Sequence, residues 1–490
     1  MVFSTLFFVF FFFVLSFAAQ AFFTDIKKKN IVLLVSSLIF YAWGGPLLVL
    51  LLCFMTFVCW YGALYISRAR SQYRKKRFMT VTAVIVLGLL GIFKYTGFLI
   101  STVNGILGIS IPDPGITLPI GISFYTFQLL SYVIDVYRGD VAAQKKYWLL
   151  LLYASLFHQC IAGPIVRYSD VNLEIENRRP VAEEVSAGVT RFATGLCKKA
   201  LLANAMASVA DSLLPNAVSS DFETVEAIAE YLASSSAFGI ILGGIAYMLQ
   251  IYLDFSAYSD MAIGMGLMIG FHYKENFNYP YTANSITDFW RRWHISLSSF
   301  FRDYVYIPLG GNRCAIPRQI FNLFCVWFLT GMWHGASWNY ILWGLYFLAF
   351  LIMEKFVIRW EKTPKSAAGA AARHVYTLVV VFFSWLLFRF EDMSLLGTAL
   401  RSMFCLNGNA FSDTVATLSF KNNVFILILA AAASVPVAGK IGDWIASWSN
   451  VRLSRAVRNI IGIAAPAVCL FISLLMLIGD SYNPFLYFQF

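Results

Sequence analysis

NIVLLVSSLIFYAWGGPLLVLLLCFMTFVCWYGALYI, residues 30–66, is a run of 37 residues without a charged side chain. One membrane crossing takes about 20 apolar residues, so the run predicts two short spans joined at Gly44-Gly45-Pro46. Lys27-Lys28-Lys29 precedes the run, and six Lys or Arg residues lie between positions 68 and 77. Because Lys and Arg collect in cytoplasmic loops, both ends of this hairpin are expected on the cytoplasmic side.

The composition of the whole chain supports the same interpretation. Of its 490 residues, 59% are hydrophobic and only 13% are charged, whereas a soluble chain is nearer half apolar and a quarter charged. A cytosolic enzyme, a nucleic-acid-binding protein and a disordered hub are therefore poor interpretations. The net charge of +11 is attributed to basic cytoplasmic loops rather than to a nucleic-acid partner. The sequence predicts an integral membrane protein.

Hydropathy also predicts the ends of the chain. Residues 1–23 are almost unbroken apolar residues with no Lys or Arg before them, which favours a retained first span over a signal peptide. Residues 460–478 form the last span, so both termini are expected outside the cytoplasm. Between about 93 and 320 the apolar runs are short and broken, as in re-entrant helices. We predict an all-α polytopic membrane protein with roughly 11 transmembrane helices plus re-entrant or interfacial helices.

The densest polar cluster is DFWRRWHISLS, residues 288–298. Ionisable groups at membrane depth are costly and usually functional. On a helix, His294 would share a face with Trp290, Arg291, Leu297 and Ser298. Such a histidine can be held by a neighbour and walled by aromatic rings. Composition alone supports equally an interfacial amphipathic helix, with Arg and Trp at headgroup level and a bystander histidine.

A second histidine lies in TGMWHGASW, residues 330–338. His334 stands between Gly331 and Gly335, a spacing of small residues that lets another backbone approach closely. For an isolated motif, a packing interface with a hydrogen-bonded core histidine is the preferred interpretation. Among the other three histidines, His374 is expected in a basic loop, and His158 and His272 have no comparable constellation.

Other polar residues leave one rival function open. Asp254 and Asp260 interrupt an apolar run and, with Arg291, suit the ion pathway of a transporter, although no two-half repeat is evident. A purely structural scaffold would leave the costly His and Arg pairs unexplained. The eight cysteines are scattered without a CxxC pair, so neither a disulfide framework nor a metal site is indicated.

Several longer motifs resemble one family. These are PIGISFY (119–125), GPI (163–165), YPY (279–281), FWRRWHISLS (289–298), FRDYVYIPLGG (301–311) and MWHG (332–335). Together they are similar to the signature of the bacterial membrane-bound O-acyltransferases (MBOATs), most of all the branch that acetylates alginate or peptidoglycan. The teichoic-acid D-alanyl transferases of the family are more distant. The resemblance covers most of the chain and favours the two-histidine interpretation.

The resemblance implies a fold and a catalytic pair. It implies one domain over residues 1–490, with its core at about 118–360, built as a ring of tilted helices around a central funnel. The family's invariant histidine corresponds to His334, a general base, and its second catalytic position to His294, an orienting or oxyanion-stabilising partner.

The resemblance also implies a donor and residues that bind it. Acetyl-CoA or another acyl thioester would serve as donor substrate, with no bound cofactor and no metal. Arg291 and Arg292 could attract a phosphorylated donor, although anchoring to lipid headgroups explains them equally well. The expected substrate- or donor-binding set is Arg291, Arg292, Trp290, Ser298, Asp254 and Trp333.

The C-terminal segment, residues 480–490, ends in the aromatic sequence FLYFQF. An interfacial aromatic anchor is the plain interpretation. The segment also resembles the C-terminal motif of the small membrane protein that accompanies the D-alanyl transferase. That resemblance implies that Tyr487 is an acyl carrier, which reaches from the outer face towards His334.

These expectations combine into one function. The chain is predicted to lie in the bacterial inner membrane and to move an acetyl group from a cytosolic thioester to an extracytoplasmic hydroxyl, for O-acetylation of an extracellular or cell-wall polysaccharide. Its expected partners are membrane lipids and an extracytoplasmic SGNH-type acyltransferase that completes the transfer. The alternatives are a D-alanyl transferase of the teichoic-acid type and, in another class, a transporter.

Overall fold

The computed structural model describes residues 3–160, 163–218, 222–360 and 366–479, and every regular element in these ranges is a helix. The all-α prediction is confirmed. The chain divides into two compact units. One unit comprises Met1–Phe192 and Tyr258–Glu275, and the other comprises Ala193–Ala257 and Asn276–Phe490.

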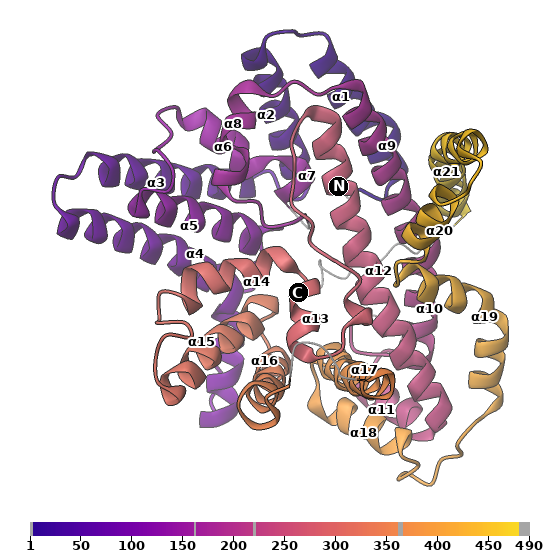
Figure 1. Cartoon of the computed structure of the whole chain (residues 1–490). Helices are drawn as coiled ribbons and strands as arrows, with labels where there is room; N and C mark the ends of the chain where they lie inside the picture. The colour runs from indigo at the N-terminus through magenta and orange to yellow at the C-terminus, as the bar shows by residue number, and fades with distance from the viewer. Residues whose placement is uncertain (1–2, 161–162, 219–221, 361–365, 480–490) are drawn as a thin grey trace. The chain divides into compact units, whose positions relative to one another are not determined.

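The first unit begins with short helices and continues with a packed group of longer ones. Its elements are η1 (Phe8–Phe12), α1 (Phe13–Ala21), α2 (Ile26–Ala42), α3 (Leu48–Arg68), α4 (Gln72–Leu107), α5 (Ile122–Arg138), α6 (Tyr147–Ser155), α7 (Phe157–Cys160), α8 (Tyr168–Asn177) and most of α9 (Ala182–Cys197). Residues 30–66 lie in α2 and α3, which break at residues 43–47 as the Gly-Gly-Pro sequence indicated. Only α3 of the two is long and apolar enough to cross a membrane, so the hairpin of two spans stays a prediction. Figure 1 shows α3 beside α4 and α5, with which it packs.

The basic segment after α3 differs from the expected loop. Only residues 69–71 connect the two helices, and Arg74 to Arg77 lie in the first turns of α4. Ser71 caps this helix, because its hydroxyl accepts a hydrogen bond from the Arg74 backbone N–H at 3.3 Å. A serine cap satisfies one of the unpaired amides of a helix start, so the helix begins before its apolar stretch does.

The second unit holds the motifs that the sequence singled out. Its elements are η2 (Lys198–Ala203), α10 (Asn204–Leu213), α11 (Val225–Ser234), η3 (Pro280–Thr282), α13 (Ile286–Arg292), α14 (Ile295–Phe301), η4 (Arg302–Tyr306), α15 (Ile316–His334), α16 (Trp338–Ile352), η5 (Met353–Ile358), α17 (Ala367–Arg389), α18 (Met393–Met403), α19 (Thr414–Ala433), α20 (Val437–Ala446) and α21 (Val451–Gly479). Its core is aromatic, with Trp293, Trp343 and Trp385 almost fully buried.

Helix α12 (Ala237–Ile269) is a single helix of 33 residues that contributes to both units. The prediction of short, broken apolar runs in this region was therefore wrong for residues 237–269. Most of its apolar window is buried inside the protein, so Asp254, Asp260 and the helix glycines face protein rather than lipid. A Cβ at Gly264 would lie 2.6 Å from the Gly188 carbonyl oxygen, so only glycine permits this approach of α9 and α12.

Seven helices in the described ranges are long and apolar enough to cross a membrane, which supports a multi-pass membrane protein. They are α3, α4, α12, α16 with η5, α17, α19 and α21. The first apolar stretch forms a shorter helix, Phe8–Ala21. The total of about 11 spans and the ring around a funnel stay predictions.

Candidate active site

His294 lies at a break in the chain, not on the continuous helix that the sequence predicted. Helix α13 ends at Arg292, Trp293 is extended, and His294 adopts the left-handed conformation (φ 43°, ψ 56°) before α14 starts at Ile295. A continuous helix would place His294 one turn from the exposed Arg291. The break instead turns the imidazole fully into the protein, with none of its surface exposed.

Asn276 holds this break through four contacts. Its backbone carbonyl accepts a hydrogen bond from the Ile295 N–H at 2.9 Å. Its side-chain Oδ1 accepts from the Ser296 N–H at 3.2 Å and from the Ser296 hydroxyl at 2.8 Å, and it lies 3.2 Å from His294 Nδ1. A non-glycine residue in the left-handed region is strained, and such strain persists where neighbouring contacts hold it. Sequence reasoning missed Asn276, because nothing in the sequence distinguishes it from the nearby Asn278.

The other neighbours of the His294 ring are aromatic. Phe255 of α12 and Trp333 of α15 meet the ring edge-on, with centroid separations of 4.7 and 5.6 Å. Burial lowers the pKa of His294 to about 3, so the imidazole is neutral at physiological pH. Its Nε2 is buried and has no hydrogen-bond partner among the described residues.

His334 is the last residue of α15 and is 5% exposed. Its ring contacts Trp343, Trp333 and Phe388 at centroid separations of 4.9, 5.1 and 5.3 Å. The close approach predicted from the glycine spacing is confirmed. A Cβ at Gly331 would collide with the Tyr340 carbonyl oxygen of α16, and a Cβ at Gly335 would collide with the Tyr340 ring.

Trp333 connects the two histidines, because its indole contacts both imidazoles. The structure therefore brings His294 and His334, 40 residues apart in sequence, to one aromatic-walled site. A desolvated site of this kind strengthens hydrogen bonds and charge interactions at a reacting group. Imidazoles are the side chains best suited to proton transfer near neutral pH.

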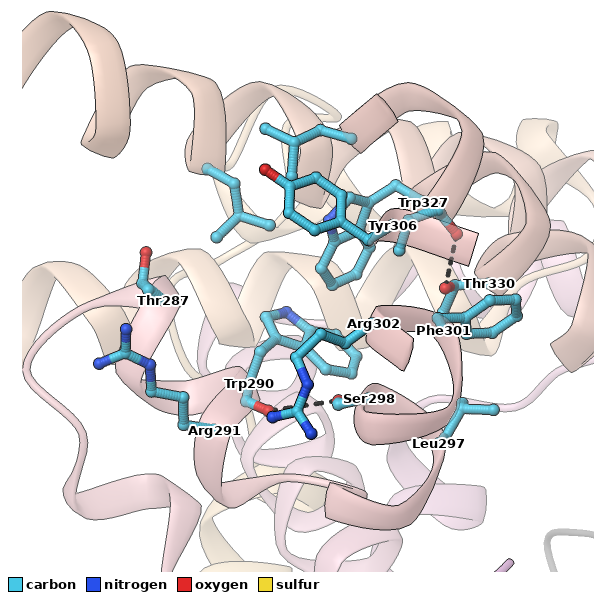
Figure 2. A pocket seen from close by; sticks show the side chains of 13 residues that line it. Thr287, Trp290, Arg291, Leu297, Ser298, Phe301, Arg302, Tyr306, Trp327 and Thr330 are labelled. Carbon is cyan, nitrogen blue, oxygen red and sulfur yellow. Dashed lines mark hydrogen bonds between the residues drawn. The ribbon is translucent and has the colours of Figure 1, made fainter. Parts of the chain in front are cut away.

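A pocket of about 220 Å³ lies in the second unit (Figure 2). Neither histidine lines it, but Trp290 of its wall packs against Trp343, which in turn packs against His334. Its walls come from α13, α14, η4, α15 and α16. Three of the predicted binding residues line it, namely Trp290, Arg291 and Ser298. Figure 2 shows the Ser298 hydroxyl, which donates to the Trp290 carbonyl at 3.3 Å, below the indoles of Trp290 and Trp327. The lining also includes Arg302, which sequence reasoning missed and which pairs with Asp303 at 2.7 Å.

The family model of the MBOAT, membrane-bound O-acyltransferase family matches residues 146–400, a segment that contains both histidines and the pocket. The chain belongs to this family. It is an O-acyltransferase, as its motifs implied.

Three curated relatives of this MBOAT show how far the similarity extends. The probable alginate O-acetylase AlgI of Azotobacter vinelandii is 35% identical over 520 residues, which cover 100% of both chains. The peptidoglycan O-acetyltransferase of Helicobacter pylori is 31% identical over 443 residues, 83% of this chain and 80% of its own. The teichoic acid D-alanyltransferase of Bacillus subtilis is 26% identical over 275 residues, 54% of this chain and 65% of its own.

The remaining predicted binding residues of this MBOAT are absent from the pocket lining. Arg292 donates from Nε to Asp288 at 3.1 Å within α13 and from Nη1 to the Thr282 hydroxyl at 3.2 Å. Trp333 contributes to the histidine site instead. Asp254 pairs with Lys199 of η2 at 2.9 Å, and both side chains are almost completely buried.

His272 and His158, for which the sequence predicted no polar partners, do have polar partners in the structure. His272 lies between two carboxylates, with Nδ1 2.7 Å from Glu174 and Nε2 3.0 Å from Glu184. These two hydrogen bonds raise its pKa. His158 is fully buried and contacts the Tyr273 hydroxyl through Nδ1 at 2.8 Å. The sequence could not reveal either constellation, because the partners come from distant segments.

Two further predictions concern other parts of this MBOAT. His374 lies inside α17 rather than in a basic loop, and its Nδ1 is 2.9 Å from the Ala283 carbonyl oxygen. The helix starts early because the Ser366 hydroxyl caps it, accepting from the Gly369 N–H at 3.1 Å.

Tyr487 lies outside the described residues, so the acyl-carrier role stays a prediction. Within the described residues no cluster of three or more His, Cys, Asp or Glu side chains could hold a metal ion.

Proposed function

We propose that this MBOAT moves an acetyl group from a cytosolic thioester across the bacterial inner membrane, for O-acetylation of an extracellular or cell-wall polysaccharide. The observation that carries the proposal is the contact of Trp333 with both His294 and His334 in an aromatic-walled site. Two relatives that match most of the chain are named as a probable alginate O-acetylase and a peptidoglycan O-acetyltransferase. The D-alanyltransferase of Bacillus subtilis matches only about half of it. Acetyl transfer is therefore favoured over D-alanyl transfer.

His334 is the general base of the proposed reaction. A hydroxyl attacks the thioester carbonyl while His334 takes the hydroxyl proton. The tetrahedral intermediate then expels the thiolate, which receives that proton, so thioester and alcohol become ester and thiol. General-base assistance of this kind is worth about 10²- to 10⁴-fold in rate. His294 acts as its partner, which orients a substrate or stabilises the oxyanion.

The pocket lined by Trp290 and Arg291 is the proposed donor site. Its wall is largely aromatic and aliphatic, with Trp290, Trp327 and Leu351, and suits the apolar parts of an acyl thioester. Arg291 is exposed at this pocket, where its guanidinium can bind the phosphates of a coenzyme A donor. Asp254 and Arg292 lie outside the lining and are not required for this role.

Delivery beyond the membrane completes the proposal. With both termini outside the cytoplasm, residues 480–490 would lie on the acceptor side. Tyr487 could then carry the acetyl group as an ester to the serine of an SGNH-type partner enzyme. Membership of an acyltransferase family supports this chemistry over the transporter alternative.

The test uses the full-length protein in nanodiscs, labelled acetyl-CoA and an added polysaccharide acceptor with the partner enzyme. His334→Ala is expected to abolish label transfer while the protein stays folded and inserted. His374→Ala is the matched control, because this histidine binds only a backbone carbonyl in the contacts described above. Undiminished transfer by His334→Ala would reject the mechanism.

A further inference from the structure

We propose that Asn276 fixes His294 in the tautomer that carries its proton on Nδ1, which leaves the buried Nε2 as a hydrogen-bond acceptor. Asn276 is then a positioning residue that acts through His294. The tautomer follows from contacts within the second unit alone, whereas its use in binding rests on the proposed function.

The first step is the orientation of the Asn276 amide. A backbone N–H can only donate, and the Ser296 N–H points at Asn276 Oδ1 from 3.2 Å. The atom at this position must therefore be the amide oxygen and not the NH₂ group. The Ser296 hydroxyl lies 2.8 Å from the same atom and fits the same assignment.

The second step is the position of the imidazole proton. His294 Nδ1 lies 3.2 Å from Asn276 Oδ1, and an amide oxygen can only accept. The Ser296 hydroxyl is 3.4 Å from Nδ1 but 2.8 Å from Oδ1, so its single proton goes to the oxygen. Nδ1 therefore carries the hydrogen. The ring is fully buried against Phe255 and Trp333, and none of the contacting side chains described above is titratable. A neutral imidazole has one N–H, so Nε2 holds a lone pair.

The third step is what this lone pair binds. Nε2 is buried without a hydrogen-bond partner among the described residues, and a buried acceptor without a donor is costly. A bound substrate that brings an O–H or N–H would satisfy it. The proton of the reacting hydroxyl goes to His334, so the group at Nε2 is a different one. An amide N–H of the pantetheine arm of the donor has the required chemistry.

This assignment separates two roles of His294. A neutral ring protonated on Nδ1 cannot donate from Nε2 to an oxyanion. His294 therefore orients a substrate and does not stabilise the tetrahedral intermediate. The loss of Asn276 should weaken the binding of one substrate more than it slows the chemical step.

The direct test is ¹⁵N NMR of histidine-labelled full-length protein in nanodiscs, with the His294 signal assigned by its loss in His294→Gln. We expect the wild-type ring to be neutral and protonated on Nδ1, and Asn276→Leu to show both tautomers. A wild-type ring protonated on Nε2 would overturn the inference. This measurement needs no turnover, so it decides the tautomer even if the protein transfers no acetyl group and the proposed function fails.

Transfer kinetics test the use of that tautomer. Asn276→Leu should raise KM roughly tenfold for one substrate, with the other KM and kcat changed less, because an orienting partner of a functional histidine is lost. We expect the rise for acetyl-CoA, because the polysaccharide is acetylated through Tyr487 and the partner enzyme, and a rise confined to the polysaccharide would contradict the contact with the donor amide. Asn278→Leu is the matched control, since this asparagine is exposed and only two residues away. Unchanged KM values for both substrates in Asn276→Leu would overturn the inference.

Asn276→Asp provides a conservative rescue. A carboxylate also accepts from Nδ1–H and from Ser296, so the tautomer and the KM at high pH should be retained. The added negative charge stabilises the protonated His294 ring. Protonation removes the lone pair on Nε2 that binds the substrate, so on acidification KM should begin to rise at a higher pH in Asn276→Asp than in the wild type. A purely structural role for Asn276 would not shift this pH profile, and an unshifted profile in folded Asn276→Asp would contradict the inference.

Discussion

Lys199 and Asp254 form an ion pair 2.9 Å long, in which the two side chains are 1% and 2% exposed. The pair joins η2 to α12 in the second unit, and Asp254 immediately precedes Phe255, the residue that packs against His294. A buried charge is tolerated where a counter-charge accompanies it. The pair thus explains why Asp254 occurs in an apolar helix, and no ion pathway is needed to account for it.

Breaking this pair should destabilise the protein strongly. Asp254→Leu leaves the Lys199 ammonium without its carboxylate, and we expect a loss of about 3–5 kcal/mol in the free energy of unfolding. Thermal and denaturant unfolding in detergent micelles measure it. The double variant Lys199→Met with Asp254→Leu removes both charges and should recover most of the loss. A double variant as unstable as the single one would contradict this account.

The crossing of α15 and α16 should depend on Gly331. Gly331→Ala forces a Cβ against the Tyr340 carbonyl oxygen, and we expect a loss of about 1–3 kcal/mol from overpacking. His334 lies on the next turn, so acetyl transfer should fall as well. Gly397→Ala is the matched control, because nothing lies within 4 Å of the added atom in α18. It should retain activity and unfold at an equal or slightly higher temperature.

The two neighbouring arginines of α13 should behave differently. Arg291→Gln removes a charge at the pocket, and we expect KM for acetyl-CoA to rise roughly tenfold, as for a lost charge-assisted hydrogen bond. Arg292→Gln should change it less, since Arg292 pairs with Asp288 outside the pocket lining. Acetyl-pantetheine, which lacks the nucleotide phosphates, should show little dependence on Arg291. Equal effects of both substitutions would contradict a phosphate contact at Arg291.

Stability should fall with rising pH through the His272 contacts. Carboxylates only accept, so bonds from both ring nitrogens to Glu174 and Glu184 require the imidazolium form. These contacts raise the pKa of His272 above its ordinary value. The contribution is therefore complete below about pH 6.5, the ordinary value, and is lost as pH rises through the higher folded value.

Melting temperatures of the full-length protein across this pH range provide the measurement. His272→Gln should flatten the decrease, whereas His374→Gln should leave it in place. An unchanged pH dependence in His272→Gln would assign the decrease to other groups.

Replacement of Tyr487 separates an acyl carrier from an aromatic anchor. Tyr487→Phe removes only the hydroxyl, so an anchor should tolerate it and a carrier should lose polysaccharide acetylation completely. Tyr482→Phe, in the same C-terminal segment, is the control and should retain activity. Mass spectrometry of the wild-type protein after incubation with labelled acetyl-CoA should place an acetyl ester on Tyr487. Normal acetylation by Tyr487→Phe would end the relay proposal.

The sequence by itself determined the fold class, the helix break at residues 43–47 and the family. Each depends on information local to the chain. A stretch of about 20 apolar residues is long enough to cross the lipid, and its length and hydropathy are read along the chain. The glycines beside His334 likewise predicted the close packing of α15 and α16, because the spacing of small residues is read along one helix.

Only the tertiary structure decided how the polar residues are used. The break at His294 depends on Asn276, the Asp254 charge depends on Lys199, and the charge of His272 depends on Glu174 and Glu184. Hydropathy predicted broken helices in a region where α12 is continuous. The prediction assumes that a membrane helix is surrounded by lipid, whereas most of the apolar window of α12 is buried against protein, where polar residues are tolerated. A buried polar group takes its conformation and charge from its hydrogen-bond partner, and in these cases the partner lies 18 to 98 residues away.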